Sequence, residues 1–154
     1  MSEEHIITDS YQRRVSYLRF SVTDRCNLHC VYCRRDGPEE FIPHEDVLRY
    51  EEIIRLVRIA RSMHVNKVRL TGGEPFARRD FDKLLLGLRE NFPDLNLRIT
   101  SNGTLMGPHI PVLKQARINA VNLSIDSFRP ETFARVTGHD LLGKVTETLD
   151  ALLD

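Results

Sequence analysis

YLRFSVTDRCNLHCVYC, residues 17–33, joins a strand pattern directly to a cluster of cysteines. In residues 17–23 apolar and polar side chains alternate, which predicts a strand with one buried face. The following residues include Cys26, Cys30 and Cys33, the only cysteines of the chain. We therefore expect a strand that leads into a metal-binding loop, because thiolates this close together on one loop can bind a single metal centre.

The cysteine trio favours an iron–sulfur cluster over other roles. Such a cluster normally takes four thiolates, so three leave one iron of a [4Fe–4S] cluster open to bind and cleave a small molecule. Burial as small apolar residues does not suit cysteines in so polar a stretch, and an odd number does not suit a disulfide framework. A structural zinc site completed by His29 or His44 stays open as an alternative, although zinc ligands more often come as separated pairs.

The length and composition of the chain predict a globular protein with a single domain. Its 154 residues can bury a core, and its 22 basic and 22 acidic side chains give a formal net charge of zero. A neutral chain has no global electrostatic reason to bind nucleic acid or a membrane surface, so any anion site must be local. We see no secretory signal or apolar run of membrane length and expect a cytoplasmic protein. The polar residues 1–14 predict an N-terminal arm ahead of a core domain over residues 15–154.

Strand patterns alternate with helical patterns after the arm, which predicts an α/β fold with a parallel sheet. Strands of such a sheet are usually apolar on both faces, but here one face of every strand is polar. This pattern predicts an incomplete partial TIM-type (β/α) barrel of about four βα units, with helices outside, a wet interior and the site at the carboxyl ends of the strands. An antiparallel sheet with one solvated side is the alternative. The expected strands cover residues 17–23, 67–71, 96–100 and 121–126, and the expected helices cover residues 47–63, 81–92, 109–116 and 130–153, with a break near Gly138.

Every expected strand ends in a loop with polar or glycine-rich residues. After the second strand, Gly72 and Gly73 allow the backbone to approach a ligand closely. The third and fourth strands lead into Thr-Ser-Asn-Gly at residues 100–103 and Ser-Ile-Asp-Ser at residues 124–127. Because the carboxyl ends of parallel strands meet at one edge, we expect these loops and the cysteines to form one site.

Two motifs together resemble the radical S-adenosylmethionine (SAM) superfamily. They are Cys-x-x-x-Cys-x-aromatic-Cys, with Tyr32 as the aromatic residue, and Gly-Gly-Glu-Pro at residues 72–75. Within this superfamily the chain is similar to the GTP 3′,8-cyclases, which begin molybdenum cofactor biosynthesis. The strings that carry this likeness are residues 17–33, residues 68–75, Arg78-Arg79-Asp80, residues 124–127 and Val136-Thr-Gly138.

The resemblance implies cofactors, substrate and site residues. Cys26, Cys30 and Cys33 would hold a [4Fe–4S] cluster whose open iron binds SAM, and cleavage of SAM would start the cyclisation of GTP to 3′,8-cyclo-7,8-dihydro-GTP. The resemblance assigns no catalytic side chain here. The implied SAM contacts are Tyr32, Gly73 and Ser124, with Gly72 and Glu74 beside them, and the implied GTP contacts are Arg19, Arg69 and Thr100. Two arginines on the polar face suit a polyphosphate, because guanidinium groups pair with phosphate oxygens in bidentate fashion; a salt bridge to Glu74 or Asp126 is the alternative role.

Some features of the family are absent from these 154 residues. They are further cysteines for a second cluster, a later lysine for GTP, the remaining strands of a six-stranded partial barrel and a Gly-Gly tail. The resemblance therefore implies an N-terminal fragment with little or no turnover alone. Expected partners are GTP, a cytoplasmic electron donor such as flavodoxin, a downstream cyclic pyranopterin monophosphate synthase and a second copy in a homodimer, with no nucleic acid and no membrane. Two other functions stay open, namely another radical SAM enzyme of peptide-modifying or activating type, and a non-catalytic zinc module.

Overall fold

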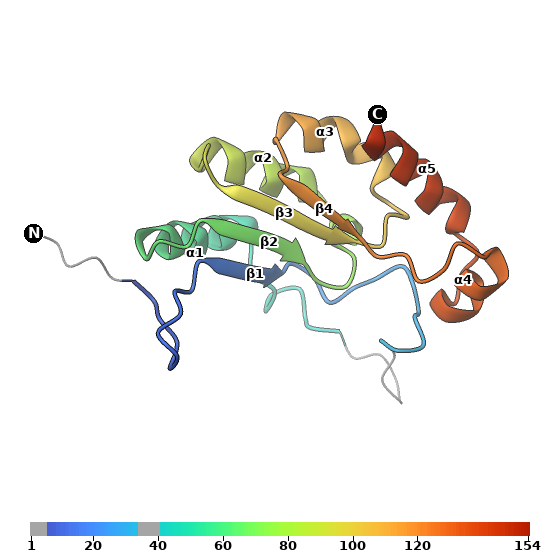
Figure 1. Ribbon diagram of the computed structural model, residues 1–154, viewed down its shortest axis with the longest axis horizontal. Coiled ribbons are helices and arrows are strands. Elements are labelled where there is room, and N and C mark those ends of the chain that lie inside the picture. Colours follow the sequence, from blue (N-terminus) through green and yellow to red (C-terminus); the bar gives the residue numbers. More distant parts are fainter. Residues whose placement is uncertain (1–5, 34–40) are drawn as a thin grey trace, which may run out of the picture.

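The computed structural model describes residues 6–33 and 41–154 and contains a four-stranded parallel sheet in the order β1-β2-β3-β4. All strand arrows point the same way in Figure 1, and α4 and the loop after β1 lie beyond their heads. The expected parallel α/β fold is confirmed, and the antiparallel alternative is wrong. The strands are β1 (Tyr17–Ser21), β2 (Lys67–Thr71), β3 (Asn96–Ser101) and β4 (Ala120–Leu123), and the helices are α1 (Tyr50–Ser62), α2 (Phe81–Asn91), α3 (Ile110–Gln115), α4 (Pro130–Thr137) and α5 (Leu142–Leu153), with short 3-10 helices at Pro75–Ala77 and Gly107–His109.

The hydrophobic core lies between one face of the sheet and the helices that cover it. Each of these helices presents an apolar stripe at helical spacing, such as Ile53, Val57 and Ala60 on α1. These stripes pack against strand residues that are completely buried, including Leu70 and Ile99. Burial of an aliphatic side chain of this size stabilises the fold by about 1.5–3 kcal/mol, so the apolar positions of the strands determine which face the helices cover.

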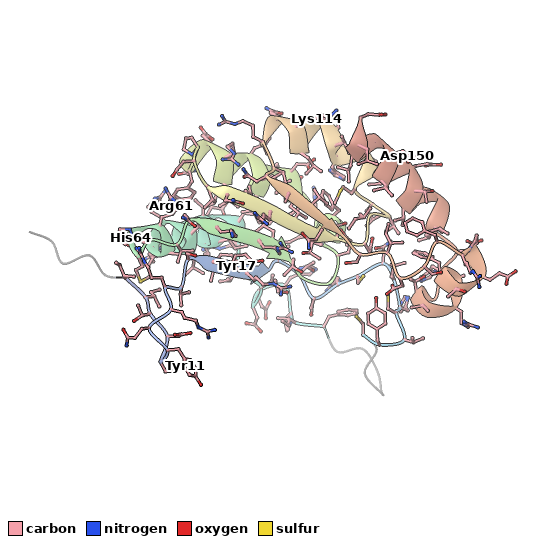
Figure 2. All side chains as sticks on the ribbon, viewed as in Figure 1. Tyr11, Tyr17, Arg61, His64, Lys114 and Asp150 are labelled. Atoms are coloured by element: carbon pink, nitrogen blue, oxygen red, sulfur yellow. The ribbon has the colours of Figure 1, made fainter. Side chains whose placement is uncertain are left out.

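The opposite face of the sheet is polar, as the alternation predicts. Arg19 is aligned with Arg69, and Arg69 with Arg98, so three guanidinium groups form one row across β1, β2 and β3. Figure 2 shows nitrogen-tipped side chains on the face of the sheet turned toward the viewer, while α1 lies behind the sheet. Within the described residues, β1 pairs only with β2 and β4 only with β3, so this face is open, as expected for an incomplete barrel of about four βα units.

Some element boundaries differ from the expected ones. β1 and β4 end at Ser21 and Leu123, two or three residues early, because the chain turns into the site loops there. α1 begins at Tyr50 instead of residue 47, and the Glu52 carboxylate accepts a hydrogen bond from the backbone N–H of Arg49 at 2.7 Å. The expected break in the last helix is confirmed at Gly138, which has a left-handed φ of 77°.

A buried arginine stabilises the end of the sheet that lies opposite the loop with the three cysteines. Arg89 of α2 is only 9% exposed, and its guanidinium donates to the carbonyl oxygens of Ala116, Pro93 and Arg117 at 2.6–2.8 Å. These carbonyls lie in the connections that lead into β3 and β4. This role could not be predicted from the sequence, because Arg89 looks like one more polar residue on an amphipathic helix.

The predicted N-terminal arm is described only from residue 6 onward, and residues 1–5 lie outside the described residues. An isolated antiparallel bridge joins Thr8 to Arg14. No helix in the described part of the chain has the length and apolar character needed to cross a membrane.

Candidate functional site

The three cysteines lie on the loop that follows β1, at the carboxyl end of the sheet. Cys26 and Cys33 are exposed, Cys30 is half-buried, and all three are free thiols. The loop contacts the end of α4, where the backbone N–H groups of His29 and Val31 donate to carbonyl oxygens of residues 137 and 136 at 2.9 Å. The cysteine loop is therefore held on two sides, by β1 and by α4.

The loop after β2 contains Gly72 and Gly73, and this Gly-Gly pair lets it cross the cysteine loop at very short range. A Cβ atom on Gly72 would lie 2.2 Å from the carbonyl oxygen of Thr23, and one on Gly73 would lie 2.1 Å from that of Arg25. The glycines instead allow backbone hydrogen bonds from Gly73 N to Thr23 O at 2.7 Å and from Glu74 N to Arg25 O at 2.8 Å. The close approach expected toward a ligand is thus also an approach to the protein's own cysteine loop.

Glu74 is completely buried and its carboxylate faces the protein interior. Its Oε1 accepts hydrogen bonds from the Ser101 hydroxyl at 2.8 Å and from the Phe76 backbone N–H at 3.2 Å, and its Oε2 accepts one from the Asn102 backbone N–H at 2.8 Å. Burial raises the pKa of Glu74, while these donated hydrogen bonds act in the opposite direction. The side chain that the resemblance places beside SAM therefore joins β2 to β3 in this structure.

Asn102 connects this buried carboxylate to the cysteine loop. Its side-chain amide lies 3.6 Å from Cys26 Sγ and 3.1 Å from Asn27 Oδ1. The Leu28 backbone N–H donates to the same sulfur at 3.4 Å. Burial raises the pKa of Cys26, and both hydrogen bonds oppose this rise. Sequence reasoning did not single out Asn27 or Asn102, although the Thr-Ser-Asn-Gly string at a strand end was a usable signal.

The remaining predicted SAM residues are Tyr32 on the cysteine loop and Ser124 on the loop after β4. Tyr32 is 62% exposed, and its hydroxyl donates to Asp126 Oδ2 at 2.9 Å. Ser124 is exposed, and its backbone N–H donates to Ser101 O at 2.9 Å. The structure thus connects the loops after β1, β3 and β4 at one edge of the sheet.

The predicted GTP residues lie on the polar face beside this edge. Arg69 donates to the Thr100 hydroxyl at 3.3 Å, and its guanidinium lies 5.8 Å from the centre of the Tyr17 ring. Its Nε is buried and has no hydrogen-bond partner among the described residues. Arg19 is exposed. The alternative role of a salt bridge is not supported, because Glu74 and Asp126 are hydrogen-bonded to the other partners given above.

Two cavities lie away from the predicted site. One, of about 540 Å³, is lined by residues that include Arg61 and His64, which Figure 2 labels at the end of the sheet opposite the cysteine loop. The other, of about 470 Å³, lies beside the start of α2 and includes Asp82 and His109. The candidate site is instead an open surface formed by the strand-end loops and the polar face.

The thiols suit an iron–sulfur cluster by their chemistry. Three free cysteines, with no fourth in the chain, provide soft ligands for three irons and leave one open. In the arrangement of residues 6–33 and 41–154, no three His, Cys, Asp or Glu side chains form a group that could hold a metal ion. The cysteine side chains would therefore have to turn toward one another to share one centre.

Fold and site together define a parallel α/β domain with a thiol-rich cofactor loop at the carboxyl ends of its strands. The family model described as "Radical SAM superfamily" matches residues 20–154. The chain belongs to the radical SAM superfamily, and membership implies a [4Fe–4S] cluster and SAM as cofactors.

Curated relatives give a more specific likeness. The chain is 42% identical to the GTP 3′,8-cyclase of Nautilia profundicola over 148 residues, which are 96% of this chain and 46% of the relative. It is 40% identical to the enzyme of the same name from Petrotoga mobilis over 147 residues, 95% of this chain and 45% of the relative. The chain thus spans about half the length of the curated relatives it matches.

Solved structures support the fold. Streptococcus suis SuiB bound to its precursor peptide SuiA matches with a TM-score of 0.66 and 22% identity, over 80% of this chain and 27% of that one. SuiB bound to S-adenosylmethionine matches with a TM-score of 0.62 and 20% identity, over 80% and 28% of the two chains. At this level of identity the likeness shows the shared architecture.

Proposed function

We propose that this chain forms the cluster-binding and SAM-binding portion of a GTP 3′,8-cyclase and contributes part of its GTP surface. The single observation that carries the GTP assignment is the row of Arg19 and Arg69 on the polar face, beside the cysteine loop. The names of the curated relatives support the same substrate. The parent reaction would be the cyclisation of GTP in molybdenum cofactor biosynthesis.

The cofactor end of the proposed site uses the strand-end loops. Cys26, Cys30 and Cys33 would bind the [4Fe–4S] cluster, and Gly73 and Tyr32 would contact SAM, chiefly through backbone groups. Gly73 is exposed on the side that does not meet the cysteine loop, which supports such a contact. When bound, these cofactors would supply the electron transfer to SAM and the radical chemistry, while the residues of this chain would orient the reactants.

The substrate end uses the polar face of the sheet. Arg19 and Arg69 lie side by side in register, and like charges placed side by side repel unless an anion lies between them. Among the described residues the buried Nε of Arg69 has no hydrogen-bond partner, and a phosphate oxygen is an acceptor that would satisfy it. Thr100 already orients the Arg69 guanidinium and is itself a proposed GTP contact. A triphosphate would satisfy both the charge and the unused donor.

GTP binding by arginine variants tests the substrate assignment. Replacing Arg19 or Arg69 with alanine should weaken GTP binding by about 1.5–3 kcal/mol, the range for hydrogen bonds to charged groups. Lysine should restore binding only in part, since it keeps the charge but loses the planar fork. Arg55→Ala is the matched control, because Arg55 is an exposed arginine of α1 and α1 covers the other face of the sheet.

The contradicting result is equally specific. GTP affinity that is equal in the parent, both alanine variants and the Arg55 control would remove the GTP assignment and favour another radical SAM enzyme, of peptide-modifying or activating type. Loss of the cluster in the arginine variants would show that these residues are structural. The titration is best made with the chain joined to the segment that follows in the longer relatives, in parallel with the 154-residue chain.

The wider setting of the protein follows from the same proposal. We propose a cytoplasmic enzyme with residues 1–14 as an arm and residues 15–154 as the core. A flavodoxin-type donor would deliver electrons, a cyclic pyranopterin monophosphate synthase would use the product, and a homodimer would be the assembled state. These partners rest on the resemblance to the cyclases, and the zero net charge agrees with the absence of a nucleic-acid or membrane partner.

A further inference from the structure

Three side chains from two strand-end loops form a closed ring of hydrogen bonds beside Cys26. Asn102 Nδ2 donates to Asn27 Oδ1 at 3.1 Å, and Asn27 Nδ2 donates to Thr104 Oγ1 at 2.8 Å. Thr104 Oγ1 closes the ring by donating to Asn102 Oδ1 at 2.7 Å. Each member donates to the next in the same direction, so no member of the ring can be reversed alone.

The orientation of the Asn102 amide follows from its surroundings. The backbone N–H of Thr104 donates to Asn102 Oδ1 at 3.0 Å, and a backbone N–H can only donate. The atom that faces Thr104 must therefore be the oxygen, and Nδ2 must face the cysteine loop. One N–H of Nδ2 is used by Asn27, and the other is directed at Cys26 Sγ, 3.6 Å away.

The backbone of Asn102 is fixed as firmly as its side chain. Its N–H donates to the buried carboxylate of Glu74 at 2.8 Å, and Glu74 is in turn held by Ser101 and Phe76. Asn102 is therefore attached to β2, to β3 and to the cysteine loop at the same time. A donor held so rigidly loses little conformational entropy when it bonds to a sulfur ligand.

We propose that Asn102 is a positioning residue that raises the reduction potential of the cluster by donating an N–H···S hydrogen bond to Cys26. The physical reason is charge, because a thiolate ligand is more negative when the cluster is reduced and a hydrogen-bond donor then stabilises it more. Hydrogen bonds to the cysteine sulfurs are among the factors that set the potentials of iron–sulfur clusters. This inference rests on the proposed binding of the cluster by Cys26.

A redox titration of the reconstituted 154-residue chain, followed by electron paramagnetic resonance, tests the proposal. Asn102→Ala removes the donor, and Asn102→Asp keeps the size and the oxygen for Thr104 but presents no N–H to sulfur. Both variants should have a lower midpoint potential than the parent. A tenfold loss in the stabilisation of the reduced state corresponds to 59 mV for one electron, and we expect a shift up to about this size for the alanine variant.

Thr104→Val is the matched control. It breaks the ring, but the Thr104 backbone N–H still holds the Asn102 oxygen, so the bond to Cys26 should survive and the potential should stay near that of the parent. Unchanged potentials in both Asn102 variants overturn the proposal. An equal shift in the Thr104 variant overturns it too, because the ring and not the bond to sulfur would then set the potential.

Failure to bind the cluster is also decisive. If the parent binds a cluster and neither Asn102 variant does, Asn102 is needed to build the site and the tuning role is wrong. If the parent itself binds no cluster, the proposed function fails first, which separates that failure from a failure of the tuning role alone.

Discussion

Gly73→Ala should damage the crossing of the two site loops. The new Cβ would lie 2.1 Å from the Arg25 carbonyl oxygen and 2.5 Å from its carbonyl carbon, and both are backbone atoms that cannot rotate away. The two loops would have to separate by about 0.9 Å to reach 3.0 Å, the shortest distance that real Cβ contacts show. That movement would break the 2.8 Å hydrogen bond from Glu74 N to Arg25 O.

The expected cost of Gly73→Ala comes from two sources. Forcing an extra methyl group into a filled space costs about 1–3 kcal/mol, and the lost backbone hydrogen bond costs about 0.5–1.5 kcal/mol more. We expect a fall of about 2–4 kcal/mol in the free energy of unfolding, measured by urea denaturation and circular dichroism. Cluster uptake should fall as well, because Arg25 immediately precedes Cys26.

Gly143→Ala provides the matched control for this substitution. Gly143 lies in α5, and a Cβ there would meet nothing within 4 Å. Alanine should therefore be neutral or stabilising by up to about 1 kcal/mol through helix propensity. If the Gly73 variant is as stable as the Gly143 variant and takes up as much iron and sulfide, the reasoning about the loop crossing is refuted.

Two further substitutions test buried polar groups. Arg89→Met should lower the free energy of unfolding by at least about 3 kcal/mol, since it leaves several carbonyl oxygens without their donors; a loss below about 1 kcal/mol in urea denaturation would show that the guanidinium is dispensable. Glu74→Gln should lower the free energy of unfolding by about 1–3 kcal/mol in the same assay. Both carboxylate oxygens of Glu74 accept a hydrogen bond from a backbone N–H, so either orientation of the glutamine amide would place its NH₂ group against one of these donors. An unchanged stability would mean that the Glu74 carboxylate does not join β2 to β3.

The sheet could be predicted from sequence because its signal is local. Alternation along each strand identified the buried and polar faces, and parallel pairing then placed Arg19 beside Arg69. Whether further strands extend the sheet could not be predicted in the same way. Whether a polar face is enclosed depends on strands that pair with β1 or β4, and the local pattern carries no information about such partners.

The candidate cluster ligands could be proposed from the sequence, but the side chains that hydrogen-bond around them could not. The spacing of Cys26, Cys30 and Cys33 marks a cofactor loop without any structure. The ring of Asn27, Asn102 and Thr104 depends on two loops that are far apart in sequence, and none of its residues is unusual locally. The resemblance places Glu74 near SAM but does not reveal its burial, which three hydrogen-bond donors from other parts of the chain make possible.

Anaerobic reconstitution with iron and sulfide, followed by addition of SAM, tests the central claim most directly. We predict a brown protein with a broad visible charge-transfer band that SAM perturbs through the open iron. Cys30→Ala should abolish that band. A colourless product that retains stoichiometric zinc would contradict the cluster assignment and support a zinc-binding module instead.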